Sequence, residues 1–312
     1  MITNNNLKIV FAGGGQLAEP IFAELAAKFD DLTLISKEDK PKGRSGKSEK
    51  SPIKNLAESK NIPIFEPRSK DDLEKMISDI KPDLVIVASL GIIITEKTLN
   101  IPKYGFINAH FSLLPLHRGP SPVQFTILNG DKKAGITVQK VVPKIDTGDI
   151  IFRHEIDLNG TETTESLGKK LSKIATEKMP KIIEDYVKGN TTPQKQNHSA
   201  ATFSKIIEKV DGKIDWSEPA RIIDRKVRAY TPWPGTYTNW HGKILKILEA
   251  TVSDNESCQK NGTFYEIEPK TYGIQTGKGT LVINKLQLEG KKPLTISDFM
   301  LGNSKIVGEI LG

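Results

Sequence analysis

The sequence is poor in the features that would place it in a specialised class of protein. Cys258 is its only cysteine, which excludes an internal disulfide framework and a thiolate metal cluster. No apolar run approaches the roughly 18 residues that are needed to cross a bilayer. The first residues, M-I-T-N-N-N-L-K-I-V-F, lack the basic start and the long apolar stretch of a signal peptide. We therefore expect a cytosolic protein without a membrane partner.

The composition is that of an ordinary globular protein. Of the 312 residues, 37% are hydrophobic and 27% are charged, values that are typical of folded chains. Because this length exceeds the size at which one hydrophobic core grows comfortably, we expect two domains. The net charge of +7 is compatible with an acidic partner such as nucleic acid, although many basic proteins bind none.

Short apolar strands alternate with helices over residues 1–188, the predicted first domain. Strands are expected at 7–12, 32–35, 63–65, 84–88 and 104–108, and helices at 17–29, 52–60 and 69–80. A strand pair at 138–142 and 150–155 and a long amphipathic helix at 163–187 follow. This alternation predicts a parallel sheet with right-handed crossovers, a Rossmann-like α/β domain. Such sheets bind ligands beyond the carboxyl ends of their strands.

The pattern changes in the last third of the chain. Residues 189–205 are polar and interrupted by Pro193, which is typical of an interdomain linker. A helix at 219–230 and five short strands are expected in the predicted second domain, 206–312. The strands fall at 235–240, 245–252, 262–267, 273–276 and 280–288. Short strands at this spacing favour a small OB-like β-barrel.

Three consecutive glycines, Gly13-Gly14-Gly15, follow the first strand, as in a dinucleotide-binding turn. The G-x-G-x-x-G pattern is not met, because Ala18 takes the place of its last glycine. Ser36 stands where an acidic residue would close the second strand. We therefore do not expect a nicotinamide cofactor, and we interpret the glycines as letting a substrate approach the backbone.

Asn108 and His110 interrupt an otherwise apolar strand at its end. In extended chain this spacing directs both side chains to one face. An amide donor and an imidazole that converge can hold a carbonyl oxygen as it becomes an oxyanion. The alternative is a hydrogen-bonded core asparagine and a surface histidine.

Asp146 lies in the turn-forming stretch I-D-T-G-D. A carboxylate near His110 would raise the pKa of that imidazole and favour its charged form. Alternatively, Asp146 only stabilises its own turn. A D-T-G motif also marks aspartic proteases, but these need two such carboxylates and a largely β chain. The five histidines show no ligand spacing, so no metal is expected.

These motifs together resemble the methionyl-tRNA formyltransferase family, nearly end to end. The stretches N-A-H-F-S-L-L-P at 108–115 and R-G-P-S-P at 118–122 are similar to the family's signatures. With Asp146 they indicate the superfamily of folate-dependent formyltransferases. The stretches S-P-I-K at 51–54 and R-A-Y-T-P-W-P-G at 228–235 are similar to its tRNA-directed members. Sugar-nucleotide formyltransferases stay open as an alternative, as does a non-catalytic RNA-binding protein on the same scaffold.

The resemblance implies a donor, an acceptor and a set of site residues. The donor would be 10-formyltetrahydrofolate, and the acceptor the α-amine of initiator methionyl-tRNA. Asn108, His110 and Asp146 would be catalytic, and the protein would be a monomer. The folate pocket would be formed by Ser89, Leu90, Gly91, Ile92, Ser112, Leu113, Leu114 and Pro115. Leu90 stands where an aromatic residue is frequent, and the leucines of the second stretch could alternatively be core filler.

Two basic segments are the candidates for tRNA contacts. By resemblance, the loop 36–51 would reach the acceptor end, with Arg44 reading the unpaired bases and Lys42, Lys47 and Lys50 contacting phosphates. In the second domain, Arg221, Arg225 and Arg228 share one face of a predicted helix. The alternative for both segments is a solvated surface.

Overall fold

A computed structural model describes residues 7–39, 49–254 and 257–312 of the chain. The residues fall into two compact units. The first contains the chain up to Pro122 with Lys133–Asp157 and Gly168–Lys205. The second contains Ile206–Gly312 and two short earlier segments, Val123–Lys132 and Leu158–Leu167. Among the described residues, no helix is both long and apolar enough to span a membrane.

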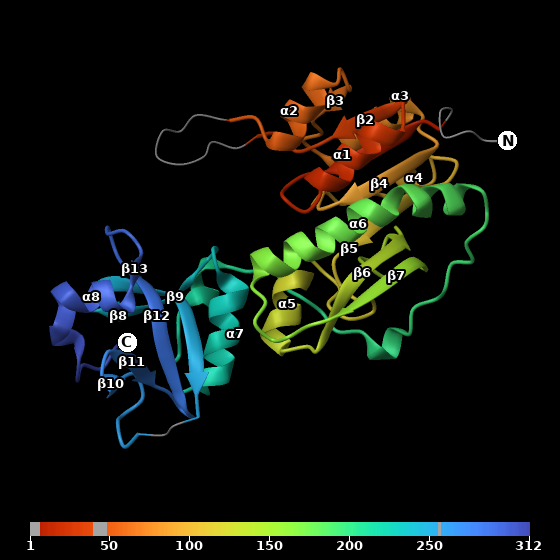
Figure 1. The fold of residues 1–312 in the computed structure, drawn as a ribbon. Helices are drawn as coiled ribbons and strands as arrows, with labels where there is room; N and C mark the ends of the chain where they lie inside the picture. Colours follow the sequence, from red (N-terminus) through yellow and green to blue (C-terminus); the bar gives the residue numbers. More distant parts are fainter. Residues whose placement is uncertain (1–6, 40–48, 255–256) are drawn as a thin grey trace. The chain divides into compact units, whose positions relative to one another are not determined.

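The first unit is built on a seven-stranded sheet in the order β3-β2-β1-β4-β5-β6-β7 (Figure 1). The strands are β1 (Ile9–Gly13), β2 (Leu32–Ile35), β3 (Ile64–Phe65), β4 (Leu84–Ala88), β5 (Phe106–His110), β6 (Lys133–Lys140) and β7 (Ile150–Asp157). Strands β1 to β5 pair in parallel, whereas β6 and β7 are antiparallel to their neighbours. Every residue of β1 and β4 is buried, as expected for a parallel sheet that is covered on both faces. The predicted Rossmann-like α/β fold is confirmed.

Helices connect the strands, and a long one braces the sheet. They are α1 (Glu19–Lys28), α2 (Pro52–Ser59), α3 (Lys70–Ile80), α4 (Glu96–Leu99), α5 (Pro122–Asn129) and α6 (Thr164–Val187). In α6, the hydroxyl of Ser172 donates to the carbonyl of Leu17 after β1, and that of Tyr186 donates to the carbonyl of Tyr104 before β5. The helix is thereby tied to two strand ends. The sequence prediction missed α4 and α5, which are short.

Gly13 has a structural purpose that differs from our interpretation. A Cβ at this position would overlap the carbonyl oxygen of Ala88 at the end of β4. The backbone of Gly14 donates to the same oxygen at 3.3 Å. Gly13 therefore permits the close approach of two neighbouring strands.

The second unit contains an antiparallel sheet in the order β10-β11-β12-β9-β8, with β13 beside β12. Its elements are α7 (Ala220–Tyr230), β8 (Thr236–Trp240), β9 (Lys243–Ser253), β10 (Phe264–Glu268), β11 (Thr271–Gln275), β12 (Thr280–Leu288), β13 (Leu294–Thr295) and α8 (Ile296–Asn303). All five predicted strands and the helix are present, and a separate antiparallel sheet domain is confirmed. The prediction missed β13 and α8.

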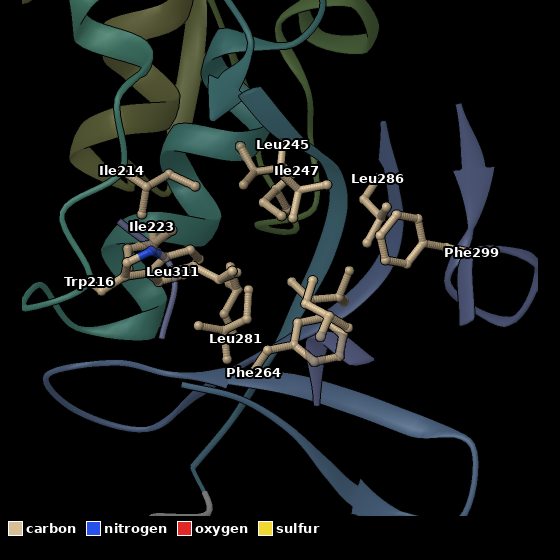
Figure 2. Packing of buried hydrophobic residues seen from close by; sticks show 14 residues of the cluster. Ile214, Trp216, Ile223, Leu245, Ile247, Phe264, Leu281, Leu286, Phe299 and Leu311 are labelled. Atoms are coloured by element: carbon tan, nitrogen blue, oxygen red, sulfur yellow. The ribbon is translucent and has the colours of Figure 1, made fainter. Parts of the chain in front are cut away.

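The core of this unit lies between the sheet and its helices (Figure 2). Ile223 and Val227 of α7 pack with Leu245 and Ile247 of β9, and Phe299 of α8 joins them. These α7 positions are four residues apart, so they lie on one face of the helix. Burial of this face fixes α7, and with it the direction of its polar side chains.

Candidate active site

Strand β5 positions Asn108 and His110. The strand runs to His110, two residues further than predicted, so both side chains belong to regular extended chain and point to the same face. Asn108 lies opposite Gln139 of β6, and His110 lies opposite Thr137. The pairing register therefore adds Gln139 to the face that carries the two predicted residues.

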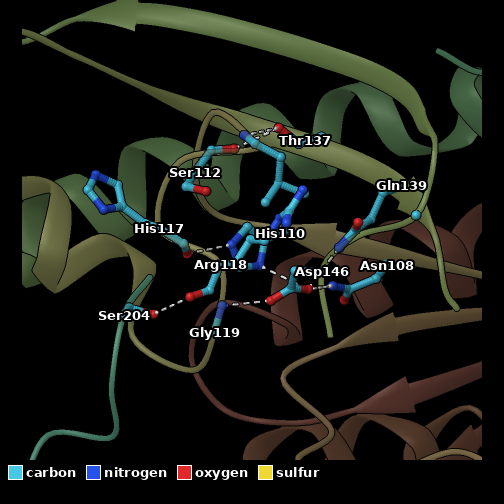
Figure 3. Close-up of polar contacts among 12 residues, drawn as sticks. Asn108, His110, Ser112, His117, Arg118, Gly119, Thr137, Gln139, Asp146 and Ser204 are labelled. Carbon is cyan, nitrogen blue, oxygen red and sulfur yellow. Dashed lines mark hydrogen bonds and ion pairs between the residues drawn. The ribbon is translucent and has the colours of Figure 1, made fainter. Parts of the chain in front are cut away.

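Asp146 comes to this face from the loop between β6 and β7. Its backbone has a φ of +53°, a left-handed conformation that is uncommon for a residue with a side chain. Asp146 Oδ2 accepts from the backbone N–H of Gly119 at 2.8 Å, and Oδ1 accepts from Gln139 Nε2 at 2.8 Å. Asn108 Nδ2 lies 3.4 Å and His110 Nδ1 3.6 Å from the same Oδ1 (Figure 3). The structure thus brings the three predicted catalytic residues together.

His110 is buried, with 5% of its surface exposed. Its Nε2 lies 3.0 Å from the carbonyl oxygen of His117. Burial lowers the pKa of the His110 imidazole below its ordinary value, and the nearby charge of Asp146 opposes that shift without overcoming it. The carboxylate acts in the direction we expected, but our expectation that the charged form is favoured is wrong, because it neglected the cost of burying the charged ring. At neutral pH the ring is uncharged.

Three further side chains complete the site: the sequence analysis missed Gln139 and Gln196 and named Arg118 only within R-G-P-S-P, without a role. Gln139 contacts the carboxylate of Asp146, Gln196 contacts its backbone carbonyl, and Arg118 lies behind Gln196. Gln196 Nε2 lies 3.1 Å from Gln139 Oε1, and Gln196 Oε1 accepts from Arg118 Nη2 at 2.6 Å. The pairing of β5 with β6 places Gln139. Gln196 comes from the polar segment 189–205 that we predicted to be a linker, and the limits of the three predicted regions stay a prediction.

The predicted folate residues divide into buried and accessible ones. The side chain of Leu90 belongs to a hydrophobic cluster of the first unit, and Leu114 is fully buried. The hydroxyl of Ser112 donates to the carbonyl of Leu116 at 2.6 Å. The remaining predicted residues, Ser89, Gly91, Ile92, Leu113 and Pro115, are half-buried or exposed. Leu90, Ser112 and Leu114 thus shape the two segments, and any ligand contact would come from the accessible residues.

The basic loop lies partly within the described residues. Lys42, Arg44 and Lys47 lie outside the described residues. The exposed Lys50 pairs with Glu58 at 2.6 Å. Further along, Lys54 is buried and forms ion pairs with Asp39, at 3.0 Å, and with Glu66. Lys54 therefore joins the first part of the loop to the residue that follows β3 instead of presenting a surface charge.

The three arginines of α7 share a helix face, as predicted, but have separate partners. Arg221 is 70% exposed and pairs with Asp254 at 3.1 Å. Arg225 Nη1 donates to the carbonyl of Asn129 at 3.2 Å. Arg228 is 17% exposed, pairs with Asp224 at 2.9 Å and donates to the carbonyl of Glu162. They line a cavity of about 180 Å³ within the second unit. Their role in tRNA binding stays a prediction.

The arrangement around Asp146 suits acyl chemistry. The Asn108 amide has a second N–H that can donate to a substrate oxygen, since Asp146 takes only one. The carbonyl of His117 can only accept, so the neutral His110 ring carries its proton on Nε2 and leaves Nδ1 as a proton acceptor. Asp146 would stabilise the cation that forms when Nδ1 takes up a proton. Within the described residues, no three His, Cys, Asp or Glu side chains gather in a way that could hold a metal ion.

Family comparisons cover both units. A family model described as "Formyl transferase" matches residues 7–183, and one described as "Formyl transferase, C-terminal domain" matches residues 206–304. A methionyl-tRNA formyltransferase of Roseiflexus castenholzii is 37% identical over 312 residues, which cover 98% of this chain and 99% of the relative. One of Alkaliphilus oremlandii is 34% identical over 309 residues, which cover 98% of this chain and all of the relative.

Solved structures share the fold at lower identity. An N-formyltransferase from Helicobacter canadensis, in complex with folinic acid and dTDP-3-aminofucose, superposes with a TM-score of 0.68. It is 20% identical, and the match covers 89% of this chain and 98% of that one. At this identity the likeness concerns the fold alone.

Proposed function

The chain belongs to the formyl transferase family, and from this premise we propose that it transfers the formyl group of 10-formyltetrahydrofolate to the α-amino group of methionyl-tRNA. The acceptor is the initiator tRNA, and the product, N-formylmethionyl-tRNA, serves translation initiation. The full-length match to relatives that carry this name supports the choice of acceptor.

The observation that carries the proposal is the convergence of Asn108, His110 and Asp146. Residues that are up to 38 positions apart in the chain meet around one carboxylate oxygen. An amide donor and an imidazole at one point provide what formyl transfer requires: stabilisation of the carbonyl oxygen and a carrier for a proton.

The proposed mechanism assigns one task to each side chain. The neutral amine of the methionyl group attacks the formyl carbon, and Asn108 Nδ2 donates to the oxygen as negative charge develops on it. His110 Nδ1 accepts the proton that the amine loses, and Asp146, 3.6 Å away, stabilises the resulting imidazolium. The charged ring then returns the proton to the departing nitrogen N10. A carbon–nitrogen bond forms, another breaks, and the site ends as it began.

The donor would lie along the accessible part of the two predicted folate segments. Ser89 and Gly91 both have positive φ, +57° and +62°, so the backbone turns sharply after β4 and exposes its polar groups. Leu113 and Pro115 are half-buried beside β5 and offer apolar surface. Accessible backbone in one segment and apolar side chains in the other are the kinds of group that bind a flat heterocycle such as a pterin.

The decisive experiment is formyl transfer from 10-formyltetrahydrofolate to methionine-charged initiator and elongator tRNA. We expect rapid formylation of the initiator and much slower reaction with the elongator. The control omits the folate, and a third reaction offers an amino-sugar nucleotide as acceptor. Transfer to the sugar nucleotide without transfer to tRNA would replace the proposed acceptor.

The alternative, a non-catalytic RNA-binding protein, predicts that the loss of Asn108 leaves the function of the protein in the cell unchanged. Asn108→Ala should lower turnover about 100-fold while the affinity for methionyl-tRNA, measured by filter binding, is retained. Unchanged function of the variant in a cell that depends on this protein would show that catalysis is not its task.

A further inference from the structure

The side chain that lies closest to the Asp146 carboxylate is outside the predicted triplet. Gln139 Nε2 is 2.8 Å from its Oδ1, compared with 3.4 Å for Asn108 and 3.6 Å for His110. We propose that Arg118, Gln196 and Gln139 form a directed chain of hydrogen bonds that orients Asp146, and that both glutamines are positioning residues for the reaction. The inference rests on the proposed function for its readout.

The hydrogen-bond chain begins at the Arg118 guanidinium, which can only donate. Arg118 is 3% exposed, and its Nε and Nη2 lie 3.2 and 2.6 Å from Gln196 Oε1. Because a guanidinium has no acceptor, Gln196 must turn its oxygen toward Arg118. Its nitrogen then necessarily points the other way.

That nitrogen faces acceptors only. Gln196 Nε2 lies 2.7 Å from the carbonyl oxygen of Gly148 and 3.0 Å from that of Asp146. Its third neighbour, at 3.1 Å, is Gln139 Oε1. Both ends of the Gln196 amide are therefore fixed, the oxygen by the Arg118 guanidinium and the nitrogen by two backbone carbonyls, because the donor or acceptor character of these groups cannot change.

The orientation of the Gln196 amide determines that of the Gln139 amide. Since its Oε1 faces the Gln196 nitrogen, its own Nε2 is directed at Asp146 Oδ1. Asp146 is thus held twice, by Gln139 on its carboxylate and by Gln196 on its backbone carbonyl. This double attachment explains how a non-glycine residue with a φ of +53° is kept in one conformation.

The fixed direction of these hydrogen bonds gives a way to distinguish an orienting role from simple packing. A carboxylate in place of the Gln196 amide would still accept from Arg118 and would keep its shape and burial. Its other oxygen would face acceptors, so the Gln139 amide would turn over to donate to it. Gln139 would then present its oxygen to Asp146, and an attraction would become a repulsion.

The test is Gln196→Glu, with Gln194→Glu as the matched control. Gln194 is two residues away, its side chain is exposed, and the structure uses only its backbone, which pairs with Ile150. For Gln196→Glu we expect kcat for formyl transfer to fall about 10- to 100-fold, the effect of losing one orienting hydrogen bond to a charged group. The KM for methionyl-tRNA should stay near the wild-type value in both variants. The melting temperature should fall in Gln196→Glu, because its new oxygen faces the carbonyl oxygens of Gly148 and Asp146, and should be unchanged in the control.

A second variant covers the case in which Gln196→Glu does not fold. Gln139→Met removes the donor to Asp146 without adding charge, and the same fall in kcat at unchanged KM is expected. A purely structural role would leave kcat of the folded fraction at the wild-type value in both variants, whatever the melting temperature, and this result would overturn the proposal. A wild-type protein that does not formylate methionyl-tRNA would contradict the proposed function instead, so the two failures are distinguishable.

Discussion

The loop around Asp146 and the helix α7 both gather polar side chains, but the two regions arrange them in opposite ways. Around Asp146, donors from β5, β6 and the segment after β5 converge on one carboxylate. On α7, each arginine reaches its own acceptor: Asp254, the carbonyl of Asn129, or Asp224. Convergence creates a site at which one substitution disturbs several contacts. Dispersed pairs act separately, so a substitution in one pair affects only the contacts of that pair.

The largest expected effect tests the convergent region. Asp146→Asn keeps the shape of the side chain but removes the charge that stabilises a protonated His110. We expect kcat for formylation to fall about 10²- to 10³-fold, since both the electrostatic and the proton-transfer contributions suffer. Asp149→Asn, the same change three residues further along, is the control and should remain active. Equal activity of the two variants would show that Asp146 only stabilises its turn.

The next effect concerns the protonation of His110. Burial lowers the pKa of His110 in the folded protein. The unfolded chain therefore binds more protons than the folded protein once the pH falls below about 6.5, the pKa of histidine in an unfolded chain. Stability is therefore present above that pH and is lost as the pH falls towards the folded value. From this residue the loss should be at most about 1.4 kcal/mol per pH unit.

Urea unfolding at pH 7 and pH 5 measures this contribution. The wild type should lose more stability between the two values than His110→Gln, in which the titrating ring is absent. An equal loss in both proteins would mean that His110 does not titrate differently in the folded and unfolded states.

Local patterns predicted most of the elements, while the contacts of the site depend on tertiary structure. Apolar runs revealed β1 and β4 because both are buried on both faces. The 108 and 110 positions were recognised because polar residues are rare in such a run. Gln139 was missed because its place depends on the register between β5 and β6, which no local pattern encodes. Strand β6 begins at Lys133, five residues before the predicted start at 138.

Two further differences between the sequence predictions and the structure also arise from tertiary contacts. Gln196 belongs to a polar segment without regular structure, and its contacts with Arg118, Gly148 and Asp146 explain its burial. For His110, the sequence suggested a carboxylate neighbour but not the depth of the ring, and burial determines the direction of the pKa shift. Burial and register arise from the whole fold, so a motif can identify reacting groups without giving their electrostatic state.

The smallest effects separate the arginines of α7 from one another. Arg228→Met breaks a largely buried ion pair and a hydrogen bond to the carbonyl of Glu162, and we expect a loss of about 1 kcal/mol in the free energy of unfolding. Arg221→Met removes an exposed pair, so stability should change by less than about 0.5 kcal/mol.

If α7 contacts tRNA phosphates, Arg221 is the arginine available for it, and its loss should reduce the salt dependence of tRNA binding by about one counterion. Urea unfolding and tRNA binding at several salt concentrations test both variants. A weaker salt dependence in Arg228→Met but not in Arg221→Met would reverse this assignment.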